Sequence, residues 1–320
     1  MIKYCCIILT FLNLAGCTHS FDKPEAIRSL KVLNSDLSQF FLETNELPEM
    51  EVFRILWSDS TAPLPFPNEK FIFSKPYLEY DFQNSKGHYR QDSIKKQFIR
   101  TGDNESVVIE VSSSRLDNCR FELQSYETMK ISSRPSFPIK ARAILFADSL
   151  QILNIEHEAA VADELPLFIR TSIEGTQYRL NATFDRIREG NRGSINAKSS
   201  IISGSQNIVD LEFDSKIGYS SMGYYFEKIN FNITLFHHLI IARIDYDHID
   251  PTSSDYISSF NKNSEIEIFE RPYRKKVGNI RLGTTNNGEL IDYFIEFRNG
   301  DTAPLAEYIP GLQKILNLKL

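Results

Sequence analysis

Two short segments begin like motifs of hydrolytic enzymes, and the first is His157-Glu158. It supplies the first two residues of the H-E-x-x-H pattern, in which two histidines one helical turn apart bind zinc and the glutamate acts as a base. The second histidine is missing, because residue 161 is Val161. Apolar and polar residues also alternate around this position, which predicts a strand. The sequence therefore argues against a metalloprotease of this kind.

The second segment, Gly218-Tyr219-Ser220, begins like the nucleophile turn of serine hydrolases. That turn requires a glycine two residues after the serine and then a helix. Met222 stands at this position and strand-like sequence follows, so we expect no nucleophile at Ser220. Glycoside cleavage needs two of the 42 acidic residues to converge, and one sequence does not show which do. We therefore assign no catalytic residue.

The densest group of potential metal ligands lies between residues 237 and 250. It comprises His237, His238, Asp245, Asp247, His248 and Asp250. No turn residue interrupts 239–244, so His238 and Asp245 should lie on one strand, about 23 Å apart at roughly 3.3 Å per residue. Side chains alternate across a strand, so Asp247 shares a face with Asp245 whereas His248 points the other way. The spacing also fails the calcium-loop pattern. We expect no metal ion and no cofactor here, but a polar strand edge followed by a helix that begins near Asp250.

Two further clusters are candidates for binding a partner. The basic cluster comprises Arg271, Arg274, Lys275, Lys276 and Arg281, with Tyr273 among them. We expect it to form a solvated strand face whose lysines discourage edge pairing; the alternative is contact with anionic lipid headgroups. The aromatic cluster comprises Tyr219, Tyr224, Tyr225 and Phe226. We expect these rings to pack in the core; the alternative is a platform for a glycan.

The first residues of the chain predict export. Lys3 precedes an apolar run that is too short to span a membrane, and small residues then lead to a cysteine in Leu14-Ala15-Gly16-Cys17. This tetrapeptide resembles the lipobox of bacterial lipoproteins. The resemblance implies that residues 1–16 are removed and that Cys17 carries a diacylglyceryl thioether and an amide-linked acyl chain. Such a protein contacts membrane lipid through Cys17. Thr18, in place of Asp, resembles the pattern of lipoproteins sent to the outer membrane, on its periplasmic or surface face.

The overall composition narrows the function further. The formal net charge is −6, and an acidic exported protein is a poor candidate for binding nucleic acid. A hydrophobic fraction of 42% indicates a folded chain. Cys5 and Cys6 leave with the signal peptide, so Cys119 is the one free thiol of the processed chain and no internal disulfide can form. We expect Cys119 to be a small buried residue of a strand.

A helical segment should follow a short tether. Residues 17–22 form the tether, Asp22 offers an N-cap, and Pro24 and Glu25 suit the first helical turn. The apolar stripe predicts a helix over about 23–45, and Pro48 begins a second helix. The apolar stripe of the first helix consists of Ile27, Leu30, Leu33, Leu37, Phe40 and Phe41. The helical segment 23–68 ends among prolines 63, 65 and 67.

From residue 69 to residue 320 the pattern predicts strands. Apolar residues alternate along 139–145, 178–184, 209–213 and 231–235, and turn residues separate these runs. We expect ten to fourteen strands, a short helix after Asp250, and another from Pro304 to about Leu318. The predicted fold is α+β and β-rich: a large antiparallel meander sheet or an open barrel, with an N-terminal helical segment and short capping helices.

This layout resembles β-rich lipoproteins of host-associated anaerobic bacteria, and the segment Phe297-Arg298-Asn299-Gly300-Asp301-Thr302 is the local match. Such proteins have no settled activity to transfer. We expect a membrane-anchored lipoprotein of the cell envelope with a non-catalytic binding or structural role and a protein or glycan partner that the sequence does not identify. The alternatives are an extracytoplasmic hydrolase that acts on envelope or host polymers and a carrier for an acyl chain or other apolar ligand. A continuous apolar cavity would favour the carrier, and a polar cleft with facing acids would favour the hydrolase.

Overall fold

The computed structural model describes residues 20–59, 61–65, 80–92, 94, 97–116, 118–131, 134–220, 223–250, 252–272, 274–285 and 290–312. The expected signal peptide, Cys17, Met222, Tyr273 and the end of the expected C-terminal helix lie outside these ranges. The chain forms two compact units. Unit 1 combines residues 1–37 with 230–320, and unit 2 comprises residues 38–229.

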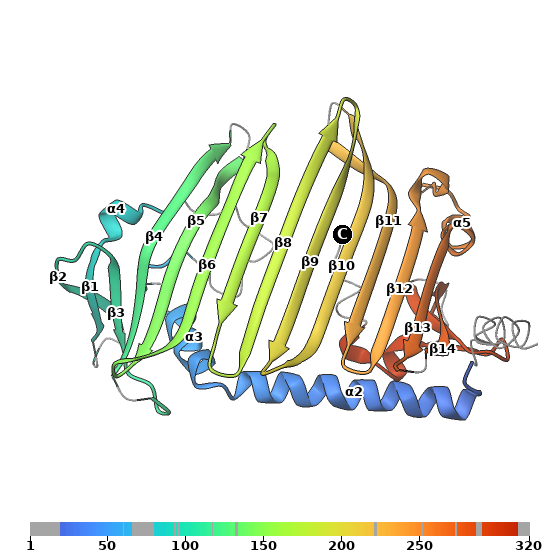
Figure 1. Ribbon diagram of the computed structural model, residues 1–320, viewed down its shortest axis with the longest axis horizontal. Coiled ribbons are helices and arrows are strands. Elements are labelled where there is room, and N and C mark those ends of the chain that lie inside the picture. Colours follow the sequence, from blue (N-terminus) through green and yellow to red (C-terminus); the bar gives the residue numbers. More distant parts are fainter. Residues whose placement is uncertain are drawn as a thin grey trace, which may run out of the picture. The chain divides into compact units, whose positions relative to one another are not determined.

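Unit 2 holds most of the long strands, which lie side by side in Figure 1. Its helices are α3 (Pro48–Ser58) and α4 (Phe82–Ser85). Its strands are β1 (Gly87–Gln91), β2 (Phe98–Gly102), β3 (Val107–Val111), β4 (Cys119–Ile131), β5 (Arg134–Ala147), β6 (Leu150–Ala162), β7 (Leu165–Glu174), β8 (Tyr178–Glu189), β9 (Arg192–Ser203) and β10 (Gln206–Ser220). Strand β11 (Gly223–Leu235) crosses into the residues of unit 1.

Unit 1 contains shorter strands and one further helix. Its elements are β12 (His238–Asp245), a 3₁₀ turn η2 (Tyr246–His248), α5 (Tyr256–Asn263), β13 (Ser264–Glu270), β14 (Lys275–Thr284), β15 (Ile291–Glu296), β16 (Thr302–Pro304) and a 3₁₀ turn η3 (Leu305–Glu307). Helix α2 (Lys23–Asn45) contributes residues 23–37 to unit 1 and 38–45 to unit 2.

All sixteen of these strands belong to one open sheet, in the order β16 to β3 along the chain and then β1 and β2. Neighbouring strands are antiparallel wherever the pairing is described, except β1 beside β3. The prediction of a β-rich chain with an N-terminal helix is confirmed. The expected number of strands was too low, because β1, β2 and β16 are short strands without a clear alternation and β3 is a short, almost continuous apolar run. Pro304 was expected to begin a helix, but it ends β16 and a 3₁₀ turn follows.

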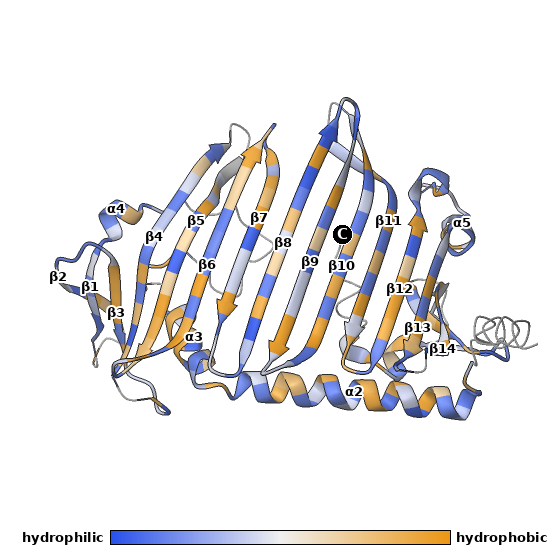
Figure 2. Ribbon diagram, in the orientation of Figure 1, coloured by the Kyte–Doolittle hydropathy of each residue, from blue (hydrophilic) through white to orange (hydrophobic). Residues whose placement is uncertain are grey.

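Helix α2 begins where the sequence places it. The Asp22 carboxylate accepts a hydrogen bond from the Glu25 backbone N–H at 2.9 Å, which caps the first turn. The stripe turns out narrower than expected: Leu30, Leu33 and Leu37 are buried, whereas Phe41 is 47% exposed. Apolar and polar residues alternate around the helix in Figure 2.

The two faces of the unit 2 sheet differ, as the banding along its strands in Figure 2 indicates. One face carries a buried core that α3 covers, with Phe53, Phe121 and Leu123 among its members. Cys119 belongs to the same core and is 2% exposed, as expected. The opposite face carries ion pairs between neighbouring strands. Their separations are 3.4 Å for Lys140–Glu127, 3.6 Å for Arg142–Glu156 and 2.8 Å for Lys198–Glu212.

Candidate apolar binding site

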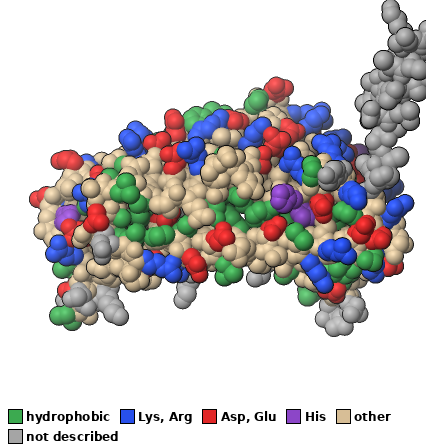
Figure 3. All heavy atoms as spheres, turned by 60° about the horizontal axis from the view of Figure 1, so that its bottom comes forward, with side chains coloured by type: hydrophobic (Ala, Val, Ile, Leu, Met, Phe, Trp, Pro, Cys, Tyr) green, Lys and Arg blue, Asp and Glu red, His purple; other side chains and the backbone are tan. Residues whose placement is uncertain are grey.

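A cavity of about 500 Å³ lies within unit 2, between the helical residues and the apolar face of β4–β9. Binding sites for small molecules typically enclose roughly 300–1,000 Å³, so this cavity is large enough for one. Figure 3 turns the lower edge of Figure 1 forward and shows hydrophobic side chains at the surface there, interspersed with charged ones.

A row of aliphatic side chains forms one wall of the cavity. Ile155, Ile173, Leu180 and Ile201 stand opposite one another across β6, β7, β8 and β9. The row follows from the period of two, because every second residue of a strand faces the same side. The sequence identified Leu180 as inward-facing, but the cross-strand register that builds the wall comes from the structure.

Aromatic rings contribute the other side. Phe40 of α2 meets Tyr178 edge to face at 5.4 Å between ring centroids, and both rings line the cavity. Trp57 of α3 stacks on Phe53 at 5.2 Å and also lines it. Burial, and then the hydrogen bond that the Tyr178 hydroxyl donates to Glu43 at 3.2 Å, raises the pKa of Tyr178. Tyr178 is therefore a neutral hydroxyl at physiological pH.

His157 is a cavity residue that the sequence places on a strand, and β6 confirms that placement. Its Nε2 lies 3.3 Å from the Pro138 carbonyl oxygen, which can only accept, so Nε2–H donates there. Its Nδ1 then accepts from the Thr171 hydroxyl at 2.9 Å. Both ring nitrogens are engaged, and the imidazole is a fixed polar part of the wall.

Glu49 is buried, with an exposed fraction of 3%, and its side chain lines the cavity. The carboxylate accepts from the Thr176 hydroxyl at 2.9 Å and from its backbone N–H at 3.2 Å. A Cβ atom on Gly175 would lie 2.8 Å from Glu49 Oε1, so a glycine leaves room for this contact. These contacts fix the first turn of α3 against the turn between β7 and β8.

A polar hollow of about 630 Å³ lies beside β1, β3 and β4 of unit 2. It contains acidic residues, so it is a candidate position for the two acids of a hydrolase. Its acids are already engaged. Glu110 pairs with Arg90 at 2.7 Å and with His88 at 3.2 Å, and Asp148 accepts from Asn118 at 2.7 Å. The hollow has the contacts of a structural ion-pair cluster.

The remaining motif residues of unit 2 also have structural surroundings. Gly218, Tyr219 and Ser220 end strand β10, so no nucleophile turn forms there. The Tyr219 hydroxyl accepts from the buried Arg186 guanidinium at 2.9 Å, and the Tyr219 ring lies under Arg188. Tyr219 of the aromatic cluster is therefore held by two arginines, whereas other members of the cluster lie at the surface.

Tyr225 is 51% exposed and Tyr224 is 37% exposed. The Tyr224 ring meets Phe226 edge to face at 5.7 Å. Core packing, which the sequence favoured, therefore fails for these two tyrosines.

In unit 1 the expected strand from His238 to Asp245 is confirmed as β12. The expectation that His248 points away from Asp245 was wrong. A 3₁₀ turn over Tyr246–His248 brings His248 Nδ1 to 3.2 Å from Asp245 Oδ1. In the part of the chain that the structure describes, no three His, Cys, Asp or Glu residues converge as a metal site.

Unit 1 also brings together a buried serine, a buried histidine and a half-buried glutamate. The Ser29 hydroxyl of α2 donates to Glu270 Oε2 at 2.5 Å and lies 2.8 Å from His238 Nε2. In a hydrolytic triad the histidine stands between the serine and the acid. Here Ser29 stands in the middle and is only 4% exposed, so the cluster holds α2 in place and does not activate a nucleophile.

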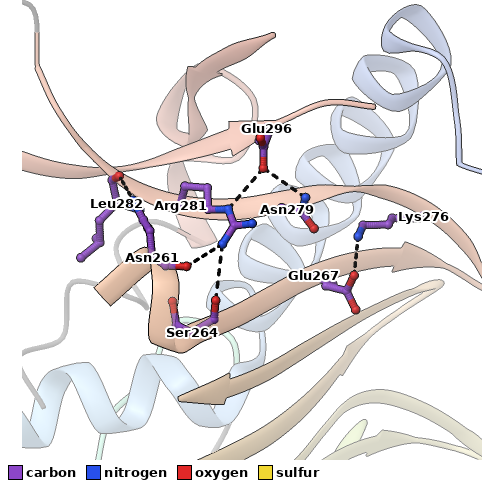
Figure 4. A network of polar contacts seen from close by, with 8 residues as sticks. All are labelled: Asn261, Ser264, Glu267, Lys276, Asn279, Arg281, Leu282 and Glu296. Atoms are coloured by element: carbon purple, nitrogen blue, oxygen red, sulfur yellow. Dashed lines mark hydrogen bonds and ion pairs between the residues drawn. The ribbon is translucent and has the colours of Figure 1, made fainter. Parts of the chain in front are cut away.

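Two members of the basic cluster, Lys276 and Arg281, form contacts within unit 1 that Figure 4 shows. Arg281 donates to Glu296 at 3.2 Å and to the Asn261 carbonyl oxygen at 2.9 Å, and Lys276 pairs with Glu267. Lys275 lies over the Phe21 ring at 4.8 Å. Each of these three cations has a partner within the protein. Their strand β14 pairs with β13 and with β15, so it is not a sheet edge and the expected role of the lysines in discouraging edge pairing was wrong.

Sequence reasoning singled out none of Glu49, Thr176 and His157 as parts of a binding site. The signal for Glu49 was present only as an acid in the first turn of a helix that begins with proline. Among the described residues, no helix is long and apolar enough to cross a membrane.

Comparisons with known proteins identify no family for this chain. No protein-family model matches the chain, and no curated protein matches it significantly. One matching solved structure is the crystal structure of a porin-like protein from Bacteroides vulgatus. It is 9% identical, the match covers 67% of this chain and 87% of that one, and the TM-score is 0.18.

Proposed function

We propose that this chain is a non-catalytic, lipid-anchored protein of the bacterial cell envelope that binds an apolar ligand in the cavity of unit 2. The observation that supports this best is the cavity itself. One wall is aliphatic and includes Ile155 and Leu180, and the other side is aromatic and includes Phe40 and Trp57. Apolar walls with few polar groups are typical of sites for small apolar molecules.

The anchor is the second part of the proposal and rests on the lipobox residues ending at Cys17. The structure adds a constraint on its reach. Ser20 forms a parallel β-bridge with Lys276, and the Phe21 backbone N–H donates to the Lys276 carbonyl at 2.9 Å. Only Thr18 and His19 then separate Cys17 from a segment held on β14, and the three residue steps from Cys17 to Ser20 span at most about 11 Å when extended. An acylated Cys17 would hold β14 close to the bilayer.

Ligand binding is tested with the soluble form that starts at Thr18. Trp57 is the one tryptophan of the chain and lines the cavity, so its emission reports on this site alone. We expect the neutral apolar probe N-phenyl-1-naphthylamine to bind with about 1:1 stoichiometry and to shift the Trp57 emission. The absence of saturable binding would refute the proposed function.

A matched pair of variants locates the bound probe. Leu180→Asp places a charge in the apolar wall, and we expect it to weaken binding at least about tenfold, because an unpaired carboxylate is costly in an apolar site. Leu167→Asp makes the same change at a residue of β7 that is 41% exposed and does not line the cavity. Equal loss in both variants would place the probe elsewhere.

The anchor has its own test. Cys17→Ala should abolish incorporation of a clickable fatty acid in growing cells and leave the protein unprocessed or soluble. Unchanged labelling of this variant would refute the lipid attachment.

A further inference from the structure

Glu49 gives the cavity a sign. Among the described residues that line the cavity it is the one Asp, Glu, Lys or Arg side chain, and His157 is held by two hydrogen bonds. The described contacts of the Glu49 carboxylate are hydrogen bonds from Thr176, which is neutral. No ion pair to Glu49 is formed among the described residues. A ligand in the cavity therefore meets the Glu49 carboxylate, and no cation among the described residues that line the cavity offsets its charge.

A carboxylate at this depth acts strongly on other charges. Coulomb interactions grow as the effective dielectric falls, and water screens a buried group less than an exposed one. With an exposed fraction of 3%, Glu49 should therefore repel an anionic headgroup drawn into the cavity. The apolar tail of a long-chain carboxylate would fit the cavity, but repulsion between its anionic headgroup and Glu49 disfavours its binding.

The same carboxylate can still accept hydrogen bonds. An ionised carboxylate has about four acceptor positions on its two oxygens. Thr176 supplies two donors, its N–H and its hydroxyl, and the hydroxyl is shared between Oε1 at 2.9 Å and Oε2 at 3.2 Å. Oε2 therefore receives one long, shared contact and has acceptor capacity for a hydroxyl group of a ligand.

We infer that the cavity selects an uncharged amphiphile, an apolar chain that ends in a hydroxyl group, over the fatty-acid anion of the same length, and that Glu49 determines this selection. This inference rests on the proposed function, since it presupposes that the cavity binds apolar chains. Glu49 also holds α3 against the turn at Gly175 and Thr176, so its loss alone would not distinguish selection from support. The ratio of two ligand affinities distinguishes them, because a supporting contact alters both affinities alike.

The test displaces N-phenyl-1-naphthylamine from the soluble protein with dodecan-1-ol or with dodecanoate, each below its aggregation concentration. For the wild type we expect the alcohol to bind at least about tenfold more tightly than the carboxylate. Glu49→Gln keeps the shape and removes the charge, and should bring the two affinities to within about threefold. Glu46→Gln is the matched control, because Glu46 is an exposed neighbour that does not line the cavity. It should retain the wild-type ratio.

Each outcome is decisive. Equal affinities for both ligands in the wild type would overturn the inference while leaving the proposed function intact, because the probe still binds. An unchanged ratio in Glu49→Gln, with the variant folded by circular dichroism, would overturn the role of Glu49. Failure of the probe to bind would refute the proposed function itself. Binding that appears only after deletion of residues 66–79 would show that this segment, and not a ligand, fills the cavity.

Discussion

Helix α2 is supported in two different ways along its length. Residues 23–37 are seated in unit 1, where Ala26, Ser29, Leu30 and Leu33 are each no more than 4% exposed. Residues 38–45 belong to unit 2 and contain no buried residue, although Phe40 lines the cavity. The seated half is held by close packing and buried hydrogen bonds, and the other half borders a space.

The difference separates stability from function. In the closely packed half, the loss of even one methylene group should lower the free energy of unfolding, because the neighbouring side chains already occupy their low-energy positions. A helix that borders a cavity makes fewer contacts and costs less to displace, which a ligand-binding wall requires. We therefore expect substitutions in the two halves to differ in what they change, with stability affected in one and ligand binding in the other.

The largest expected effect comes from truncating the seated half. Leu30→Ala should lower the free energy of unfolding by about 2–5 kcal/mol, because Leu30 is fully buried and leaves a cavity. Leu42→Ala removes the same atoms from a side chain that is 60% exposed and should cost about 0.5 kcal/mol or less. Urea unfolding followed by circular dichroism measures both. Similar losses in the two variants would remove the distinction between the halves.

Ser29→Ala tests the buried hydrogen bonds of the seat. The substitution leaves His238 Nε2 and the Glu270 carboxylate without their shared partner, and an unsatisfied buried polar group costs about 1–3 kcal/mol. Ser38→Ala, at an exposed position of the same helix, is the control and should be near neutral. Hydrogen exchange should show faster opening of residues 23–37 in Ser29→Ala alone.

The seat should also weaken in acid. Burial lowers the pKa of His238 below its ordinary value of 6.5, and this outweighs the opposite effects of Glu270 and Asp36. Because Ser29 Oγ–H donates to Glu270, His238 Nε2–H donates to Ser29 Oγ, and Nδ1 is buried with no hydrogen-bond partner among the described residues. As the pH falls below 6.5, the unfolded chain takes up this proton before the folded one does. His238 should therefore lower the free energy of unfolding by at most about 1.4 kcal/mol per pH unit between 6.5 and its folded pKa.

A neighbouring histidine provides the control for that prediction. His238→Gln should flatten the pH dependence in this range, whereas His237→Gln, at an exposed position, should remove only the minor part that His237 contributes to lowering the pKa of His238 and leave most of the dependence. Thermal unfolding between pH 5 and pH 8 measures the difference. A wild-type stability that does not fall toward pH 5 would contradict the assignment.

The sequence indicated the helix but not the two ways in which it is supported. The cap at Asp22, Pro24 and the apolar spacing predicted its limits, because these signals are local. The partners of Ser29 lie 209 and 241 residues away, and no local pattern pairs residues at that distance. Alternation likewise showed that Leu180 faces inward. It could not show that the facing side chains leave about 500 Å³ between them, since a cavity depends on how separate elements pack.

A modest effect on stability is expected at Phe40, on the half of α2 that borders the cavity. A fully packed phenylalanine typically costs about 3–5 kcal/mol when truncated to alanine. Phe40 is only half-buried and adjoins an existing space, so Phe40→Ala should lose mainly ring contacts, among them those with Phe41 and Tyr178, each worth about 0.5–1.5 kcal/mol. Binding should change more, because the ring is part of the cavity wall. We expect weaker binding of N-phenyl-1-naphthylamine, with the Trp57 emission of the free protein almost unchanged. A saturating ligand should slow hydrogen exchange of residues 38–45 in the wild type and leave residues 23–37 unaffected, since a ligand stabilises only the conformations that bind it. A stability loss at Phe40 as large as that of Leu30→Ala, or equal protection of both halves by ligand, would mean that α2 is supported uniformly.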